Sequence, residues 1–168
     1  MTARTLSRQR YDQTVRVFYL DASALVKRYF VETGSAWVES LCANEVSHAI
    51  AIAHFGLVET AAAFAAKRRG QFITPAEHEA ALADLLRDAD RRYRLVKVAP
   101  LTIDEAIQLT RRRKLRGYDA IHLACALALN RPLVDSGLPS LTFVAADDDL
   151  LAAAAAEGLP VDNPNRHL

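Results

Sequence analysis

The sequence predicts an α/β protein: a single three-layer α/β/α domain built on a mainly parallel sheet of four to five strands. Short apolar runs of strand type alternate with longer segments of helical periodicity from residue 17 to residue 162, an alternation typical of a parallel sheet covered on both faces. The 168 residues, 51% of them hydrophobic, match the length and core content of one domain. No internal repeat or interdomain linker divides the sequence.

The first half of the domain is predicted to alternate two strands with helices. The run VFYL is short, apolar and aromatic, which is typical of a strand. The Ala-rich segment HFGLVETAAAFAAKRRG favours a helix that ends in basic residues and stops at Gly70. In order, the predicted elements are a strand at 17–20, a helix at 23–30, a helix at 36–43, a strand at 47–52 and a helix at 54–69.

The second half continues the alternation. Thr74 and Pro75 are typical of a helix start, and Thr102 is a candidate cap for the helix after the third strand. The segment YDAIHLACALAL is apolar almost all round and should be a buried helix. The predicted elements are a helix at 75–93, a strand at 95–100, helices at 102–114 and 118–129, a loop at 130–140, a strand at 141–146, a helix at 147–157 and a short strand at 159–161.

The ends of the chain are predicted to lie outside this domain. Residues 1–16 form a polar leader of disordered composition, and residues 163–168 form a short tail. The leader lacks the apolar segment of a secretory signal, and no run is long enough to span a bilayer. Cys42 and Cys125 have no partner pattern and are expected to be reduced, buried thiols. We therefore expect a cytoplasmic protein without membrane contact.

Four acidic residues occur at positions that a simple role as solvent-exposed surface residues does not explain. Asp21 directly follows the first strand, and Asp147 follows the fourth strand in the same way. Because the carboxyl ends of parallel strands meet at one edge of the sheet, both should project from that edge. Asp119 begins the apolar helix, and Glu59 lies among apolar neighbours, where a lone carboxylate is costly. Helix capping is an alternative explanation for Asp147 and Asp119.

Taken together, the four acids predict a metal site. If they converge into one pocket, their like charges repel unless a cation neutralises them. Carboxylate ligands favour hard ions, so we expect Mg²⁺ or Mn²⁺, held partly through waters. Such an ion activates water and stabilises charge developing on a phosphate, which is the chemistry of nucleases.

Four segments in this order carry a resemblance to a known family: LDASALVKRYFVETGSAWVESL, GLVETAAAFA, LRGYDAIHLACALAL and TFVAADDDLLAAAAAEGL. They resemble the PIN-domain ribonucleases, in particular the VapC-type toxins of bacterial toxin–antitoxin pairs. The resemblance runs from residue 17 to about residue 158. It implies a PIN-like nuclease domain at 17–162, usually a homodimer.

The resemblance also assigns roles to residues. It makes the four acids the catalytic and metal-binding residues: Asp21, Glu59, Asp119 and Asp147. Ser23 matches the supporting hydroxyl that commonly follows the first acid. Asp149 is a further candidate ligand, although a helix-start role is favoured for it and for Asp148.

The activity that the resemblance implies is that of an endoribonuclease toxin. It would hydrolyse phosphodiester bonds of single-stranded or looped RNA, such as tRNA, by a metal-activated water with Mg²⁺ or Mn²⁺. A small VapB-type antitoxin would hold this activity in check. The alternative is a non-catalytic PIN-like module that binds RNA or protein through the same groove. A haloacid-dehalogenase-like phosphatase is disfavoured because it would need a second Asp where Ser23 stands.

Contacts to RNA phosphates must come from local cations, since 21 Lys and Arg nearly balance 20 Asp and Glu. The run RRRKLRG ahead of Asp119 supplies two candidates, Arg116 and Arg113. For Arg113 a solvated helix end is an equally good explanation. His122 lies one turn beyond Asp119, and we favour a core histidine with satisfied hydrogen bonds there.

Overall fold

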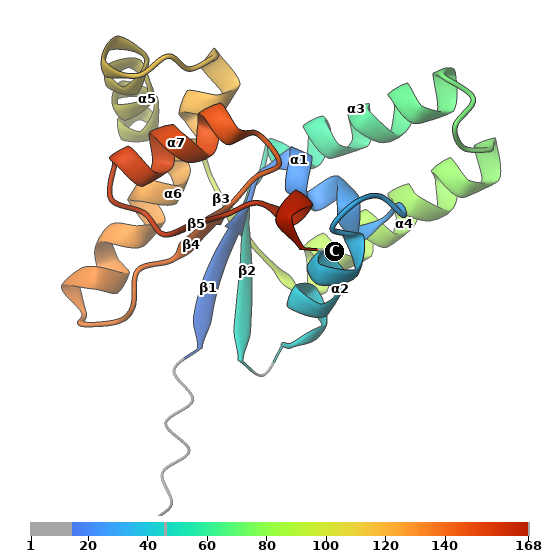
Figure 1. Ribbon diagram of the computed structural model, residues 1–168, viewed down its shortest axis with the longest axis horizontal. Helices are drawn as coiled ribbons and strands as arrows, with labels where there is room; N and C mark the ends of the chain where they lie inside the picture. Colours follow the sequence, from blue (N-terminus) through green and yellow to red (C-terminus); the bar gives the residue numbers. More distant parts are fainter. Residues whose placement is uncertain (1–14, 46, 168) are drawn as a thin grey trace, which may run out of the picture.

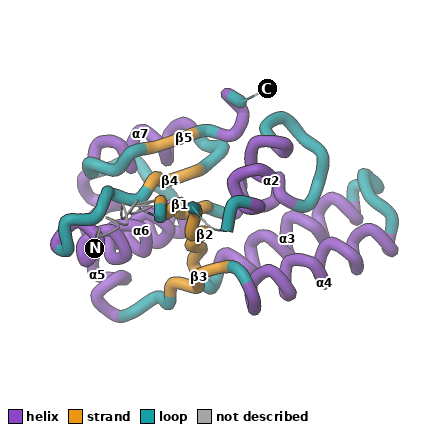
Figure 2. Tube along the Cα trace, turned by 90° about the horizontal axis from the view of Figure 1, so that it is seen from below, coloured by secondary structure: helices purple, strands orange, loops and turns teal. Residues whose placement is uncertain are grey.

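The sheet has five parallel strands in the order β3-β2-β1-β4-β5. The computed structural model describes residues 15–45 and 47–167, so most of the predicted leader at 1–16 lies outside the described residues. Figure 1 shows the sheet between two groups of helices, and Figure 2 shows its strands in this order. The strands are β1 Arg16–Leu20, β2 His48–Ala53, β3 Tyr93–Val96, β4 Thr142–Val144 and β5 Val161–Asp162.

Helices cover both faces of the sheet, as the sequence predicts (Figure 1). On one face lie α1 Ala22–Leu25, α2 Ser35–Ala43, α3 Gly56–Arg69 and α4 Pro75–Arg91. On the other lie α5 Pro100–Arg112, α6 Gly117–Asp135 and α7 Asp148–Ala156. Two short 3-10 turns, Val26–Arg28 and Pro164–Arg166, complete the described elements. None of the described helices is long and apolar enough to cross a membrane.

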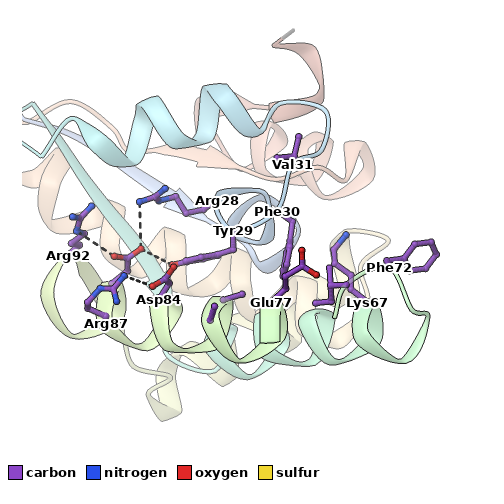
Figure 3. Close-up of a pocket in the computed structure, with 14 residues that line it drawn as sticks. Arg28, Tyr29, Phe30, Val31, Lys67, Phe72, Glu77, Asp84, Arg87 and Arg92 are labelled. Carbon is purple, nitrogen blue, oxygen red and sulfur yellow. Dashed lines mark hydrogen bonds and ion pairs between the residues drawn. The ribbon is translucent and has the colours of Figure 1, made fainter. Parts of the chain in front are cut away.

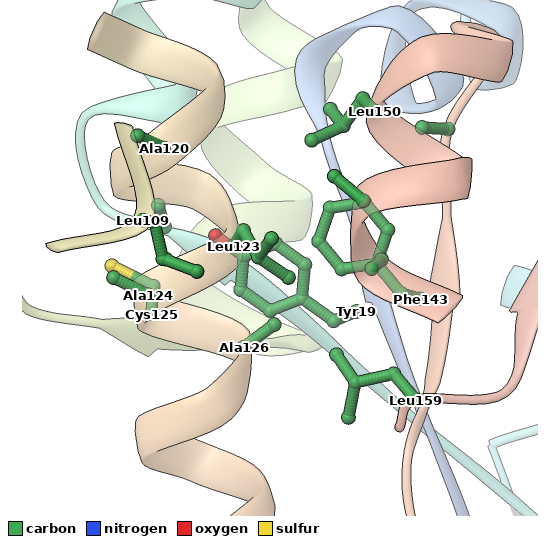
Figure 4. Packing of buried hydrophobic residues seen from close by; sticks show 14 of the residues in the cluster. Tyr19, Leu109, Ala120, Leu123, Ala124, Cys125, Ala126, Phe143, Leu150 and Leu159 are labelled. Atoms are coloured by element: carbon green, nitrogen blue, oxygen red, sulfur yellow. The ribbon is translucent and has the colours of Figure 1, made fainter. Parts of the chain in front are cut away.

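Alternation along the strands divides the core into two layers. Tyr19 of β1 points to the cluster beneath α5, α6 and α7, whereas Phe18 and Leu20 point to the cluster beneath α1 to α4. In the first cluster the Tyr19 ring stacks on Phe143, with centroids 5.4 Å apart (Figure 4). Leu123 of α6 lies beside this pair. Because both faces are buried, the strands read as continuous apolar runs.

The segment 130–140, predicted to be a loop, is helical in its first half, so that prediction is wrong there. Helix α6 continues through Pro132 to Asp135. Proline removes one helical hydrogen bond, but Leu129 and Leu133 on this stretch pack against the core cluster. Apolar burial therefore outweighs the local turn signals of the sequence.

The prediction of a tail outside the domain at 163–168 also needs correction, because residues 163–167 pack onto the domain. Asn163 is buried, and its side chain accepts a hydrogen bond from the Asn165 backbone N–H at 2.9 Å. The His167 ring stacks on Trp37 of α2, with centroids 4.1 Å apart. These contacts join the end of the described chain to α2.

Candidate active site

The ends of β1 and β4 bring the first and last predicted acids to one edge of the sheet. Leu20 lies opposite Val144 in the parallel register, and the Asp21 backbone N–H donates to the Val144 carbonyl at 3.1 Å. The Ser23 hydroxyl oxygen accepts from the Ala146 backbone N–H at 2.8 Å. The two strand ends are therefore fastened together just before Asp21 and Asp147 project from them.

Asp21 is a buried carboxylate at the start of α1, with only 6% of its surface exposed. It accepts hydrogen bonds from the Ser23 hydroxyl at 2.7 and 2.9 Å and from the Ala24 backbone N–H at 2.9 Å. Burial raises the pKa of Asp21 to about 6, and the charge of Glu59 adds to this, while His122 and the hydrogen bonds oppose it. The structure thus holds a carboxylate whose ionisation is costly without a nearby cation.

Glu59 is held by a chain of hydrogen bonds that begins in the core. The Tyr19 hydroxyl lies 3.0 Å from His122 Nδ1, and His122 Nε2 lies 2.6 Å from Glu59 Oε2. Burial raises the pKa of Tyr19 well above its usual value, so its hydroxyl stays protonated and can donate to Nδ1 while Nε2 donates to Glu59. Tyr19 and His122 are buried, so this chain fixes the direction of the Glu59 carboxylate.

Asp119 and Asp147 share a second part of the site. They line a cavity of about 340 Å³ together with Lys114, Leu115, Arg116, Asp149 and Leu150. Burial raises the pKa of Asp119, the Asp147 charge raises it further, and Arg116, whose Nε lies 3.9 Å from Asp119 Oδ2, lowers it. Asp147 is also the N-cap of α7, accepting from the backbone N–H groups of Asp149 and Leu150 at 2.9 and 3.1 Å.

The four acids therefore form two linked pairs. Asp21 interacts electrostatically with Glu59, and Asp119 with Asp147, while His122 acts on both Asp21 and Asp119. Within residues 15–45 and 47–167, no three His, Cys, Asp or Glu side chains lie close enough to hold a metal ion directly.

The chemistry of the pairs nevertheless fits a hydrated divalent ion. Mg²⁺ usually keeps several waters and binds through one or two carboxylates. Asp21 offers a buried carboxylate whose raised pKa reflects the cost of its charge, and a cation would remove that cost. The donors are oxygen atoms, which suit Mg²⁺ or Mn²⁺.

The remaining predicted residues have separate settings. Arg113 is tied to Glu157, with Nε 2.9 Å from Oε1, and donates to the Ala156 carbonyl at 3.1 Å. This pairing fastens the end of α5 to the end of α7, so Arg113 is not a free cation for RNA. The Arg116 side chain is 86% exposed beside the cavity. The Asp148 carboxylate accepts a hydrogen bond from the Arg166 guanidinium at 2.8 Å.

A larger cavity, of about 760 Å³, lies on the other helical layer and contains none of the four acids. It is lined by the segment from Arg28 to Val31 and by residues of α3 and α4 (Figure 3). Asp88 accepts from the Tyr29 hydroxyl at 3.1 Å and lies 3.5 Å from Arg92 Nε. The charged groups that line this cavity are mostly paired with each other, as Arg28 and Arg92 are with Asp88 and Arg87 is with Asp84.

Known proteins resemble this chain in sequence. Ribonuclease VapC45 of Mycobacterium tuberculosis (strain CDC 1551 / Oshkosh) is 38% identical over 120 residues, which cover 68% of this chain and 77% of the relative. Ribonuclease VapC49 of M. tuberculosis (strain ATCC 25618 / H37Rv) gives the same figures. The chain belongs to the VapC family of PIN-domain ribonucleases. No protein-family model matches the sequence.

Solved structures agree with the VapC assignment at the level of the fold. FitAcB from Neisseria gonorrhoeae superposes with a TM-score of 0.62 at 16% identity, covering 90% of this chain and 99% of its own. VapBC2 from Rickettsia felis, bound to a promoter DNA fragment, gives 0.59 at 12% identity over 88% and 98%. VapC20 of M. tuberculosis, a sarcin-ricin loop cleaving toxin, gives 0.56 at 18% identity over 84% and 95%. The predicted three-layer PIN-like fold is confirmed.

The sequence analysis of this VapC family member missed one contact of the candidate site. It predicted His122 to be a core histidine with satisfied hydrogen bonds, and the structure confirms that both ring nitrogens have partners. It did not predict that Glu59 is one partner and Tyr19 the other. The only sequence signal was the placement of His122 one turn after Asp119, on a helix otherwise apolar.

Proposed function

We propose that this VapC family protein is a metal-dependent endoribonuclease, the toxin of a toxin–antitoxin pair, that hydrolyses phosphodiester bonds in single-stranded or looped RNA such as tRNA. The observation that carries the proposal is Asp21: a buried carboxylate with a raised pKa, fixed at the strand edge where Glu59 also acts on it. Two relatives at 38% identity are named ribonucleases, and VapC20 is named for cleaving an RNA loop.

The proposed cofactor is Mg²⁺ or Mn²⁺, bound by the acids already described and assisted by Asp149. When bound, such an ion lowers the pKa of a water and offsets charge that develops on the phosphate. Within the chain, Ser23 holds the Asp21 carboxylate and His122 holds that of Glu59. Arg116 is exposed beside the cavity, where its guanidinium can contact an RNA phosphate.

The proposed protein partners are a VapB-type antitoxin and a second copy of the chain, in the cytoplasm. The larger cavity supports the first, because Val31 and Phe72 on its rim are 97% and 81% exposed, and exposed apolar patches mark interaction sites. The solved VapBC2 structure supports a partner of this class. Leu101 and Ile107, 80% and 53% exposed on α5, support a homodimer.

A second candidate function is a non-catalytic module that binds RNA or protein. It is favoured by one observation, namely that no three potential ligand side chains of the described chain converge on one point. In that case the acids would cap helices and shape a groove without hydrolysing anything.

One experiment separates the two candidates. The purified protein, free of antitoxin, is incubated with end-labelled RNA and Mn²⁺ or Mg²⁺, with and without EDTA. We expect cleavage that EDTA abolishes and that Asp21→Asn reduces by a factor of at least about 100, the scale of losing a group that positions the reacting atoms. Asp90→Asn, an exposed acid on α4, is the matched control and should cleave normally. No cleavage at all would favour the module, whereas cleavage that EDTA does not abolish would contradict the proposed dependence on a metal ion.

A further inference from the structure

Three aromatic rings form a row that ends at the candidate active site. Tyr118 stacks against Phe55 with ring centroids 6.1 Å apart and planes 29° apart. Phe55 in turn lies 4.6 Å from the His122 ring. His122 hydrogen-bonds Glu59, and Tyr118 directly precedes Asp119. The row therefore contacts Glu59 at its inner end, and its outer ring belongs to the residue that precedes Asp119.

Burial changes steadily along the row. His122 is 3% exposed, Phe55 is partly buried and packs against the core cluster, and Tyr118 is 65% exposed. The outer ring is thus open to solvent while the ring behind it is anchored. A single exposed aromatic is ordinary on a protein surface, but this one is stacked on a partly buried ring and directly precedes Asp119 in the sequence.

The cations that line the cavity of Asp119 suit a polyanion. Arg116 is 86% exposed, and Lys114, also exposed, lines the same cavity as Asp119. Cations that follow a backbone together with aromatic rings that stack bases are the standard means of binding single-stranded nucleic acid. A base can stack on such a ring only when it is unpaired and turned out of its helix.

We propose that Tyr118, supported by Phe55, stacks an unpaired base of the RNA next to the phosphate that the acids process. Tyr118 is then a substrate-contacting residue that selects single-stranded or looped RNA over duplex. This inference rests on the proposed function for its substrate, and it adds a residue and a mode of recognition to it. Arg116 and Lys114, which line the cavity of Asp119, contact the neighbouring phosphates.

The test measures binding without cleavage. In an Asp21→Asn background, the full chain is titrated into a short RNA hairpin with 2-aminopurine at single loop positions, and both fluorescence quenching and Kd are recorded over a range of salt. Adding Tyr118→Ala should raise Kd by roughly 5- to 100-fold, the scale of one base–aromatic stack, and remove the quenching at one loop position. Tyr118→Phe keeps the ring and should stay within about twofold.

Two further variants sharpen the result. Arg116→Ala should reduce the salt dependence of Kd, whereas Tyr118→Ala should leave it unchanged, because a stack releases no counterions. Val134→Ala removes an apolar side chain that is 51% exposed near the other end of α6 and should change neither quantity.

The inference is overturned if Tyr118→Ala retains Kd and quenching, or if its Kd changes only in step with a loss of dimer in sedimentation, which would make Tyr118 an interface residue. Failure of the proposed function has a different signature. The wild-type protein would then bind the hairpin through Tyr118 yet cleave nothing in Mn²⁺ or Mg²⁺.

Discussion

Asp21 combines two properties that oppose each other in the absence of metal. Its side chain is buried and serves as the N-cap of α1, which fixes its geometry. The same burial raises its pKa to about 6, so the ionised form needed to bind a cation is costly at neutral pH. A rigid carboxylate that lacks a cation is thus a source of instability that a bound divalent ion would relieve.

The first prediction concerns stability without metal. A raised pKa means that the folded state binds the Asp21 proton more tightly than the unfolded chain, so this contribution is present below pH 4 and is lost as pH rises through 6. The shift from 3.8 to about 6 corresponds to about 3 kcal/mol. Relative to wild type, Asp21→Asn should therefore gain about 3 kcal/mol of unfolding free energy between pH 3 and pH 8 in EDTA.

The measurement is urea denaturation of both proteins across that pH range, repeated with Mn²⁺. Added Mn²⁺ should stabilise wild type more than Asp21→Asn, which narrows the difference at pH 8. If the difference in unfolding free energy between the two proteins stays constant with pH, then folding does not raise the pKa of Asp21.

At the scale of elements, local sequence patterns predicted the features that are set by residues close together in the sequence. The strand β1, the edge position of Asp21 and the buried helix α6 follow from apolar runs and the parallel-strand rule. The last turns of α6 could not be predicted in this way. The turn signals around Pro132 are local, but Leu133 packs against the core cluster, whose residues are far away in the sequence. The pairing of His122 with Glu59 spans 63 residues, and no local pattern encodes such a distance.

The start of helix α4 follows a local sequence pattern, the capping box. The Thr74 hydroxyl accepts from the Glu77 backbone N–H at 3.2 Å, and the Glu77 carboxylate accepts from the Thr74 N–H at 2.7 Å, forming a capping box. Thr74→Ala should lower the unfolding free energy by about 1 kcal/mol. Thr110→Ala, which removes an exposed hydroxyl bonded to the Ile107 carbonyl, is the control and should cost under about 0.5 kcal/mol. Equal costs would argue against the box.

At the scale of the whole molecule, the segment after the edge strand β5 returns to the helical layer on one face of the sheet. This segment packs on α2 through His167 and Trp37. Gly34, the residue before α2, has φ +82°, and a Cβ there would lie 2.1 Å from the Pro164 carbonyl oxygen. The close approach of these two backbones requires a residue without a side chain at position 34.

The last prediction isolates that contact. Gly34→Ala should cost more than about 2 kcal/mol, because left-handed strain of about 1 kcal/mol adds to a clash of similar or greater size. Gly137→Ala has nearly the same φ, +75°, with nothing within 4 Å of its Cβ, so it reports the strain alone. Deleting residues 163–168 removes Pro164, and the cost of Gly34→Ala should then fall to that of Gly137→Ala. Denaturation of wild type, Gly34→Ala, the deletion and the deletion with Gly34→Ala should give a coupling of about 1–3 kcal/mol. No coupling would mean that this segment does not contact the start of α2.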